Sequence, residues 1–287
     1  MNDHIADSGQ KKLSERPEHP TITAYVIAYN EADKIEAAIG SVLWADNVIL
    51  ADSHSTDATV EIAERLGAEV IQIDFDGFGK LRNSVLEHCT NDWIFSLDAD
   101  ERCTTEARDE ILRVIADPNS ADVYKVPRRN WFMGRWIRHG GWYPNFRQPQ
   151  LFRRGSLRYD ELPVHEGWIP ADDASVEVLN ADIWQFPFQN LGEIQRKANR
   201  YSTLGAKVLA QRGRRSSMLT AVLHGLYSFV KHYVFKLGLL DGWPGFVIAA
   251  GTLEGAFYKH AKRNEAMNAE KWAPPPAERL ERPDKQP

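Results

Sequence analysis

Cysteine is scarce in this chain of 287 residues, which contains only Cys89 and Cys103. The spacing of the two matches no zinc-binding framework, and so few cysteines are typical of a reducing compartment. We therefore interpret both as incidental thiols.

Long apolar runs are also missing. No run reaches the roughly 18 to 20 apolar residues that a membrane-spanning helix needs. Residues 1–20 are polar and lack the apolar core of a signal peptide, so we interpret them as a disordered lead-in. Residues 273–287 are rich in proline and charge and are typical of a frayed tail. The modest net charge of −5 gives no reason to expect nucleic acid as a partner.

The first half of the chain alternates between two kinds of pattern. Apolar, partly β-branched runs predict strands at residues 22–29, 48–51, 68–73 and 93–97. Segments with a helical period lie between and after them, at residues 34–43, 58–66, 80–88 and 105–116. This alternation predicts an α/β fold with a doubly wound, mostly parallel sheet. Ligands bind beyond the carboxyl ends of such strands, which brings together the loops at 29–33, 52–57, 74–82 and 98–101.

The most informative loop is Asp98-Ala99-Asp100-Glu101, which ends an apolar strand. Residues two apart at a strand end can present their side chains to the same side. Two carboxylates placed in this way suit a hard divalent cation that keeps water and phosphate oxygens as its other ligands. The loop therefore predicts a site for Mg²⁺ or Mn²⁺ at the sheet edge, although Asp-x-Asp alone is a weak signal.

Two further loops favour a nucleotide. Asp52 ends a strand and can accept hydrogen bonds from a base or ribose, whereas we interpret Asp57 as a helix cap. Gly77 and Gly79 precede Lys80 and Arg82 at the start of a predicted helix, an arrangement that can cradle a diphosphate.

Taken in order, the four loops resemble glycosyltransferase family 2: they read Tyr29-Asn30-Glu31, Asp52-Ser53-His54-Ser55-Thr56-Asp57, Gly79-Lys80-Leu81-Arg82-Asn83 and Leu97-Asp98-Ala99-Asp100. The resemblance covers residues 21–170. It implies the GT-A fold and an inverting transfer from a nucleotide sugar. Many members have Asp-Asp-Gly where this chain has Asp52-Ser53-His54, and the usual Glu-Asp pair that carries the catalytic base is missing.

The resemblance also implies roles for individual residues. It implies that the nucleotide sugar is bound by Tyr29, Asn30, Glu31, Asp52, Lys80, Arg82 and Asp98. It implies that Asp98 and Asp100 meet the metal. Beyond these, we expect His165 to complete the metal shell or to orient its neighbour.

An inverting transfer needs a carboxylate that takes the proton of the acceptor hydroxyl. The candidates lie in the segment 159–166, where we favour Glu166 as the base, followed by Asp160 and Glu161. The segment from Gln148 to Trp168 also resembles the family 2 branch that adds glucose or a similar hexose to the heptose-containing core of lipopolysaccharide. That branch commonly uses UDP-sugars, so UDP-glucose is the first donor to test.

Acidic residues are absent between Lys125 and Arg158, where nine basic residues alternate with aromatic ones. Arginine suits phosphate and carboxylate groups, and aromatic faces stack on sugars, so this stretch predicts an anionic acceptor. The acceptor contacts that we expect are Trp142, Arg147, Gln150 and Arg153.

From residue 189 onward the chain is predicted to be helical, at 191–211, 218–237 and 244–263. A second basic stretch from Arg196 to Arg215 precedes the apolar, aromatic-rich helices. This combination fits a protein that lies on an anionic membrane face, so we expect a cytoplasmic protein, peripheral on the inner face of the cytoplasmic membrane. The alternative is that these helices only pack on the catalytic domain.

We expect a GT-A catalytic domain at 21–188, with a nucleotide-sugar half at 21–117 and an acceptor half at 118–188, followed by a helical extension at 189–272.

Three alternatives in function stay open. Asp98-Ala99-Asp100 also resembles the nucleophile motif of haloacid-dehalogenase phosphatases, although it continues with Glu101. A nucleotidyltransferase can share the nucleotide-binding half, and the chain can instead be a carbohydrate-binding membrane protein without catalysis.

Overall fold

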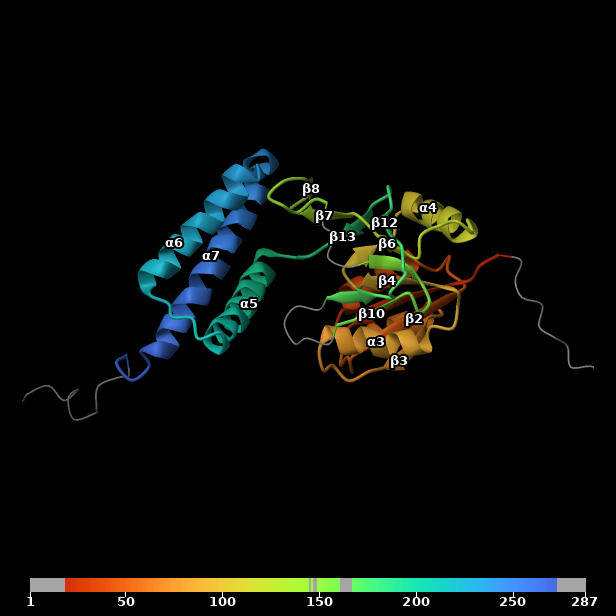
Figure 1. Ribbon diagram of the computed structural model, residues 1–287, viewed down its shortest axis with the longest axis horizontal. Coiled ribbons are helices and arrows are strands. Elements are labelled where there is room, and N and C mark those ends of the chain that lie inside the picture. The colour runs from red at the N-terminus through yellow and green to blue at the C-terminus, as the bar shows by residue number, and fades with distance from the viewer. Residues whose placement is uncertain (1–18, 145, 147–148, 161–166, 273–287) are drawn as a thin grey trace, which may run out of the picture.

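The computed structural model describes residues 19–144, 146, 149–160 and 167–272. A sheet covered by helices on both faces forms one part of the molecule, and three long helices project from its side (Figure 1). A short connection after the last strand joins the two parts.

The main sheet has seven strands in the order β12-β6-β9-β4-β1-β2-β3. Four neighbouring strands run parallel: β1 (Ile22–Ala28), β2 (Asn47–Asp52), β3 (Glu69–Gln72) and β4 (Trp93–Asp98). β9 (Pro149–Arg153) is antiparallel to both β4 and β6 (Val123–Lys125), and β12 (Val176–Val178) pairs parallel with β6. The sheet is thus doubly wound, and its neighbouring strands β3, β2, β1 and β4 are parallel, as the alternation of patterns predicted.

Helices alternate with the parallel strands: α1 (Ala32–Gly40), α2 (Thr59–Arg65), α3 (Phe78–His88) and α4 (Thr105–Ala116). All four lie within a few residues of the predicted bounds, and α4 begins and ends at the predicted residues. Its start is fixed by Thr104, whose side chain accepts a hydrogen bond of 3.0 Å from the amide of Ala107.

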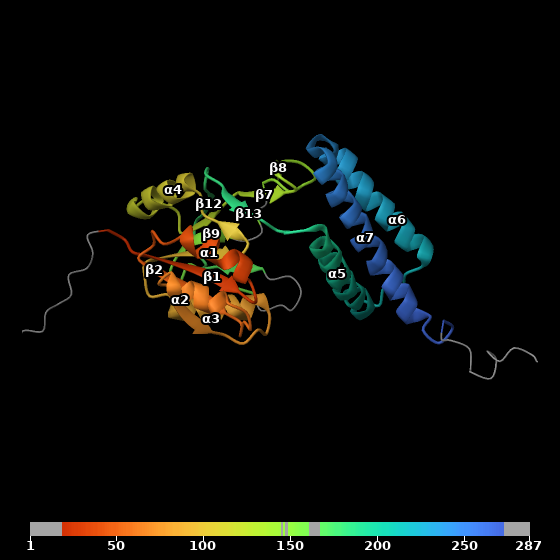
Figure 2. The same ribbon diagram turned by 180° about the vertical axis from the view of Figure 1, so that it is seen from behind.

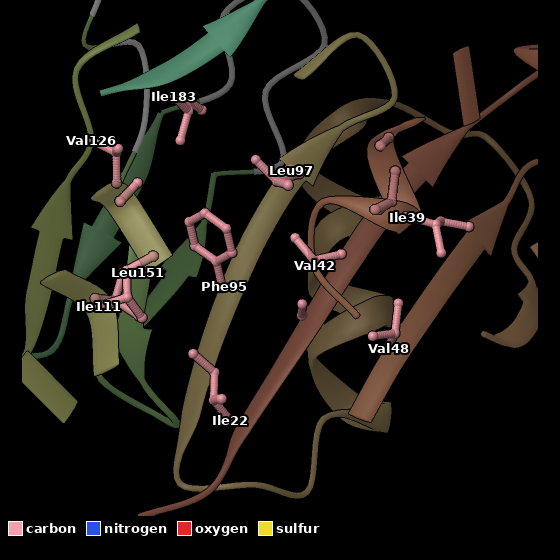
Figure 3. Close-up of a cluster of buried hydrophobic side chains, with 14 of the residues drawn as sticks. Ile22, Ile39, Val42, Val48, Phe95, Leu97, Ile111, Val126, Leu151 and Ile183 are labelled. Atoms are coloured by element: carbon pink, nitrogen blue, oxygen red, sulfur yellow. The ribbon is translucent and has the colours of Figure 1, made fainter. Parts of the chain in front are cut away.

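The core lies on both faces of β1, all seven residues of which are buried. One face packs against α1, α2 and α4; Figure 3 shows Ile39, Phe95 and Ile111 in this cluster. The other face packs against α3 through Leu81 and Val85. A strand buried on both faces is typical of parallel sheets, and it holds the loops at its carboxyl end on a rigid base.

A second, four-stranded sheet has the order β5-β13-β7-β8. Its strands are β5 (Glu101–Arg102), β13 (Ile183–Gln185), β7 (Arg128–Phe132) and β8 (Arg135–Ile137). A separate pair joins β10 (Leu157–Tyr159) to β11 (Trp168–Pro170). These short strands were not predicted, because each has five residues or fewer and lacks an extended alternation of apolar and polar residues.

The projecting part consists of α5 (Leu191–Gln211), α6 (Met218–Val230) and α7 (Gly242–Met267), with α7 packed between the other two (Figure 2). The predicted helix at 218–237 is interrupted: after α6 come a π-helix, η1 (Lys231–Phe235), and a 3₁₀ turn, η2 (Gly238–Asp241). The turn is tight at Gly238, where an added Cβ would lie 2.7 Å from the carbonyl oxygen of His232.

No single helix in the described ranges is long and apolar enough to cross a bilayer. The segments Met218–Phe235 and Gly238–Met267 together meet the requirements of length and composition, but they are bent by 71° relative to each other.

Candidate active site

The parallel strands bring the predicted loops to one edge of the main sheet. Asp52, the last residue of β2, pairs with Ala28 of β1, and Asp98, the last residue of β4, pairs with Ile27 on the other side of β1. The loops after β1, β2 and β4 are therefore neighbours, as the rule for the carboxyl ends of parallel strands predicted.

Three carboxylates gather at this edge. Asp98, Asp100 and Glu101 each place an oxygen so that the three oxygens lie within 4.8 Å of one another. Asp98 and Asp100 are half-buried and Glu101 is buried. Hard oxygen donors at this spacing can hold Mg²⁺ or Mn²⁺, so the side chains present fit the predicted cation.

Glu101 is the member of this cluster to which the sequence analysis gave no role. Its carboxylate accepts hydrogen bonds from Arg128 Nη1 at 2.8 Å, from Gln150 Nε2 at 2.7 Å and from the amide of Asp98 at 3.1 Å. Both side chains of the Glu101–Arg128 ion pair are at most 5% exposed. Glu101 thus joins β5, β7 and β9 behind the Asp98–Asp100 turn. Its position directly after Asp-x-Asp is the sequence signal that could have identified it.

Asp100 differs from its neighbours because, among the residues that the structure describes, none donates a hydrogen bond to its carboxylate. Burial raises its pKa to about 7, the negative charges of Asp98 and Glu101 add to this rise, and Lys197 and Lys34 partly offset it. Burial and its two acidic neighbours therefore disfavour the ionised form of Asp100, and a bound cation would favour that form.

Arg82 holds Asp98. Its guanidinium donates to Asp98 Oδ1 at 2.6 Å and to Ser96 Oγ at 2.8 Å, and its side chain is 6% exposed. Its Cζ lies 5.5 Å from the ring centroid of Tyr159. The structure therefore places Arg82, predicted to lie near the nucleotide or diphosphate, on the Asp98 carboxylate, where it fixes the orientation of that group.

A network of short hydrogen bonds joins the loops after β1 and β2. Asp52 is fully buried and accepts from the amide of Ser55 at 2.8 Å and from its hydroxyl at 2.5 Å. The Ser55 hydroxyl in turn accepts from the amide of Asn30 at 2.8 Å, and Asn30 Oδ1 accepts from the amide of Thr56 at 2.7 Å. Asn30 has a φ of 53°, a conformation that asparagine tolerates better than most residues. Asn30 and Asp52 thus shape the loops, while Tyr29 stays 60% exposed beside them.

Asp57 connects the starts of two helices. It accepts from the amide of Ala32 at 3.1 Å and from the amide and hydroxyl of Thr59 at 3.0 and 2.5 Å. Burial acts to raise the pKa of Asp57, but these hydrogen bonds outweigh it and the net shift is downward. This geometry agrees with the interpretation of Asp57 as a cap.

The loop before α3 has free space at Gly77, because no atom beyond its chain neighbours lies within 4 Å of the position that a Cβ would take there. Gly77 has a φ of 105°, a conformation that L side chains rarely adopt. Lys80 forms an ion pair with Asp76 and its side chain is 46% exposed. Lys80 therefore lies at the surface in the first turn of α3, within the segment that was predicted to cradle a diphosphate.

A cavity of about 410 Å³ opens beside Asn30 and Glu31. Its far side is lined by three residues from the beginning of the helical part: Gln189, Glu193 and Arg196. Lys197 lies on the same helical turn and donates to the carbonyl of Pro187 at 2.7 Å. The helical part therefore contributes charged groups to the edge that carries the acid cluster, a role that the sequence analysis did not assign to it.

The match to a family model decides the classification: residues 23–166 match the model for glycosyl transferase family 2. This chain belongs to glycosyl transferase family 2. The match and the mixed sheet together confirm both the GT-A fold and the enzyme class, a glycosyltransferase.

Relatives along nearly the whole chain have the same class. An uncharacterized glycosyltransferase of Rickettsia bellii is 30% identical over 85% of this chain and 86% of its own length. The lipopolysaccharide core biosynthesis glycosyltransferase LpsC of Rhizobium meliloti is 28% identical over 84% of this chain and 91% of its own.

Among solved structures, the glucosyl-3-phosphoglycerate synthase of Mycobacterium tuberculosis in complex with Mn²⁺, UDP and glucosyl-3-phosphoglycerate is similar, with 23% identity and a TM-score of 0.35. The similarity covers 38% of this chain and 44% of that one, so the match spans less than half of the solved protein.

Four predicted residues of this family 2 enzyme lie outside the described residues: Arg147, Glu161, His165 and Glu166. Their roles as acceptor contact, base candidates and metal ligand stay predictions. Asp160 is described: it directly follows Tyr159, and its amide donates to the carbonyl of Gly167 at 2.9 Å. Asp160 therefore follows directly on Tyr159, whose ring lies against Arg82, the residue that holds Asp98.

The other predicted acceptor contacts lie in different environments. Arg153 pairs with Trp93, the first residue of β4, whereas Asp98 is its last residue. Since β9 runs antiparallel to β4, Arg153 lies at the opposite edge of the sheet, and we withdraw it from the acceptor site. Gln150 is 4% exposed and donates to Glu101, which makes it a support of the acid cluster.

Trp142 is half-buried and packs on Phe132 and Phe188, with ring centroids 6.3 and 5.9 Å apart. Part of the basic and aromatic stretch is therefore structural. Arg129 lies over the rings of Trp136 and Trp184 and pairs with Asp182 at 2.6 Å.

Proposed function

We propose that this enzyme is an inverting hexosyltransferase that moves a hexose, with UDP-glucose as the first donor to test, onto an anionic glycolipid, the inner core of lipopolysaccharide. The observation that carries the proposal is the acid cluster of Asp98, Asp100 and Glu101 at the carboxyl edge of a family 2 sheet. The relative LpsC, whose name places it in lipopolysaccharide core biosynthesis, supports the acceptor class.

Asp98 and Asp100 would hold Mg²⁺ or Mn²⁺, and Glu101 would keep them in place. When bound, such a cation neutralises negative charge on the diphosphate leaving group. The protein supplies the rigidity: Arg82 fixes Asp98, and the Arg128–Glu101 pair fixes the turn that carries Asp100. Lys34 and Lys197 add positive charge to the same edge.

The proton of the acceptor hydroxyl needs a base on the side of the sugar opposite the leaving group. We propose Glu166 for this role, with Asp160 and Glu161 as the other candidates. The support is their place in the chain, because this segment follows Tyr159, which packs against Arg82 beside Asp98.

An anionic acceptor is supported by the basic residues that the fold leaves exposed. Arg128, Arg129 and Arg153 have acidic partners at 3.4 Å or less and so carry structural charge. Arg135 lies 4.0 Å from Asp241, and its side chain is 47% exposed. Arg135 and Arg138 are exposed on β8 and just after it, close to the end of the helical part. We propose that the enzyme works on the inner face of the cytoplasmic membrane, where such an acceptor would be presented.

Calorimetric titration tests the donor half of this proposal. The protein is titrated with UDP, UDP-glucose, GDP-mannose and ADP-heptose, each with and without Mn²⁺. We expect binding of a UDP compound that depends on the metal, and loss of that dependence in Asp100→Ala but not in Asp172→Ala, which removes an exposed carboxylate elsewhere.

Absence of any nucleotide binding by the folded protein would contradict the proposal. Metal-dependent binding without sugar transfer to any core oligosaccharide would favour the non-catalytic carbohydrate-binding alternative. Release of pyrophosphate from a nucleoside triphosphate would favour a nucleotidyltransferase.

A further inference from the structure

The outer face of α6 and the turn that follows it is apolar and exposed. α6 packs on α7, and only Ala221 and Gly225 of its 13 residues are buried. Leu219, Leu223 and Leu226 are 68%, 57% and 53% exposed. These positions follow a helical period and form a stripe along the side of α6 that no described residue covers.

The stripe continues into the bent end of the helical part, residues 235–246, which we name the tip. Six large apolar side chains of the tip are 39% to 75% exposed: Phe235, Leu237, Leu239, Leu240, Trp243 and Phe246. A patch of this kind marks an interaction surface, because folded proteins seldom leave so many large apolar groups together in water.

Basic side chains lie beside the tip. The backbone carbonyl of Lys236 accepts a hydrogen bond of 2.8 Å from the amide of Gly140. The side chain of Lys236 runs along Gly141. Arg138, exposed just after β8, lies over the ring of Trp136 at 4.3 Å. Arg135 Nη1 lies within 4 Å of the position that a Cβ on Gly242 would take. Three cations thus surround the base of an apolar projection.

The only acidic residue between Met218 and Leu253 is Asp241, and it faces inward. It is 1% exposed and accepts hydrogen bonds from the amides of Arg138 and His139, at 3.2 and 2.8 Å. Its charge is therefore used to join the tip to the β7–β8 hairpin, and the outer surface of the tip carries basic groups alone.

We propose that the tip inserts into an anionic lipid leaflet and that Arg135, Arg138 and Lys236 bind the lipid phosphates around it. The inference rests on the proposed function, which it deepens by assigning the surface that brings the enzyme to a glycolipid. Charge complementarity selects the occupant: an anionic leaflet matches the basic surround, whereas the same tip on a second copy would repel it.

The positions of two lysines also favour insertion of the tip into one leaflet over a helix pair that crosses the bilayer. Lys236 lies between the two segments that would have to form a span, and Lys231 lies within the first of them. A charged side chain at the centre of a bilayer is costly, but at the interface it reaches the headgroups while the neighbouring apolar groups enter the acyl region.

The test is flotation of the full chain with liposomes of neutral phosphatidylcholine or of phosphatidylcholine with phosphatidylglycerol. The tip variant is Leu239→Ser/Leu240→Ser, at positions 43% and 54% exposed. The matched control is Leu43→Ser/Leu112→Ser, at positions 48% and 41% exposed in the catalytic domain. We expect the partition coefficient of the tip variant onto anionic liposomes to be lower than that of the wild type by about tenfold or more. We expect the control to match the wild type.

A second pair of variants tests the phosphate contacts. Arg138→Gln/Lys236→Gln removes two of the three cations and keeps the apolar tip. We expect weaker binding to anionic liposomes, a smaller loss of binding on raising the salt concentration, and no change with neutral liposomes. A free phosphate site would instead show inorganic phosphate competing with liposomes at millimolar concentration.

Two results would overturn the proposal. One is equal flotation of the tip variant and the wild type. The other is a wild-type dimer that the tip variant dissolves, measured by sedimentation without lipid, which would assign the tip to a second copy. Metal-dependent UDP binding, measured in parallel on each variant, separates these results from a failure of the proposed transfer function, because the acid cluster is left unchanged.

Discussion

The carboxyl edge of the main sheet and the tip of the helical part differ in which side chains they bury and which they expose. At the edge, charged groups such as Arg82, Arg128 and Glu101 are buried and paired within the protein. At the tip, apolar groups are exposed and the one acid is buried. Each region departs from the usual distribution of polar and apolar groups, and each departure supports a ligand that we propose: a cation and a diphosphate at the edge, and a lipid leaflet at the tip.

The largest effect is expected at Asp100. Asp100→Ala removes a carboxylate that accepts no hydrogen bond from the described residues. We therefore expect sugar transfer to fall by about 10²- to 10³-fold or more, while the melting temperature stays close to that of the wild type. Initial rates at saturating Mn²⁺ and a thermal melt are the two measurements. Transfer at the wild-type rate would mean that the edge is not a metal site.

A second prediction concerns the Glu101–Arg128 ion pair that supports that edge. Glu101→Gln leaves the buried Arg128 guanidinium without its counter-charge, and breaking a buried pair in this way costs about 3–5 kcal/mol. Urea unfolding should therefore show a loss of stability of this order, together with weaker Mn²⁺ binding. Stability equal to that of the wild type would show that the Glu101–Arg128 pair contributes little in the folded enzyme.

A third prediction compares two leucines directly. Leu50 of β2 is fully buried, whereas Leu223 of α6 is 57% exposed. Leu50→Ala should cost about 2–5 kcal/mol in the free energy of unfolding, and Leu223→Ala less than about 0.5 kcal/mol in the absence of lipid. Denaturant titration of both variants checks the difference. Similar losses would mean that α6 is covered in solution.

The smallest effect concerns pH. Glu110 on α4 accepts from the amides of Asn180 and Ala181, at 3.0 and 2.6 Å. Burial acts to raise the pKa of Glu110, but these hydrogen bonds outweigh it, so its folded pKa lies below the ordinary value of 4.5. The stabilisation is therefore present above that value and is lost as the pH falls through the folded pKa.

Unfolding at a series of acidic pH values should accordingly show a shallower loss of stability for Glu110→Gln than for the wild type. Glu106→Gln, at an exposed position on the same helix, is the control and should keep the wild-type slope. Parallel curves for the wild type and Glu110→Gln would contradict the assignment.

The sequence predicted the parallel half of the fold well because its signals are local. The strands of the core are continuous apolar runs, and α4 and α5 have side-chain caps at Thr104 and Asn190. The acid cluster was found for the same reason, since Asp98 and Asp100 follow a strand directly. The division of the chain into domains stays a prediction.

What the sequence did not predict depends on contacts between distant segments. Arg128 is 27 residues from its partner Glu101, and Gln150 is 49 residues from it, so no local pattern marks either as a support of the acid cluster. Arg153 was misplaced because the direction of β9 cannot be inferred from five residues. Lys197 reaches the acid cluster only because the chain returns to the sheet edge before α5 begins.

If the tip enters a leaflet as proposed, the hydrogen bonds of Asp241 have a consequence for the choice of acceptor. Because they connect the tip to the β7–β8 hairpin, and β13 connects that hairpin to β5 beside the acid cluster, the catalytic edge is held at a constant height above any surface that the tip enters. An acceptor fixed in that surface by its lipid must then reach up to that height with its sugars. Acceptors that are too short would not reach, so the enzyme would select by chain length as well as by the identity of the terminal sugar.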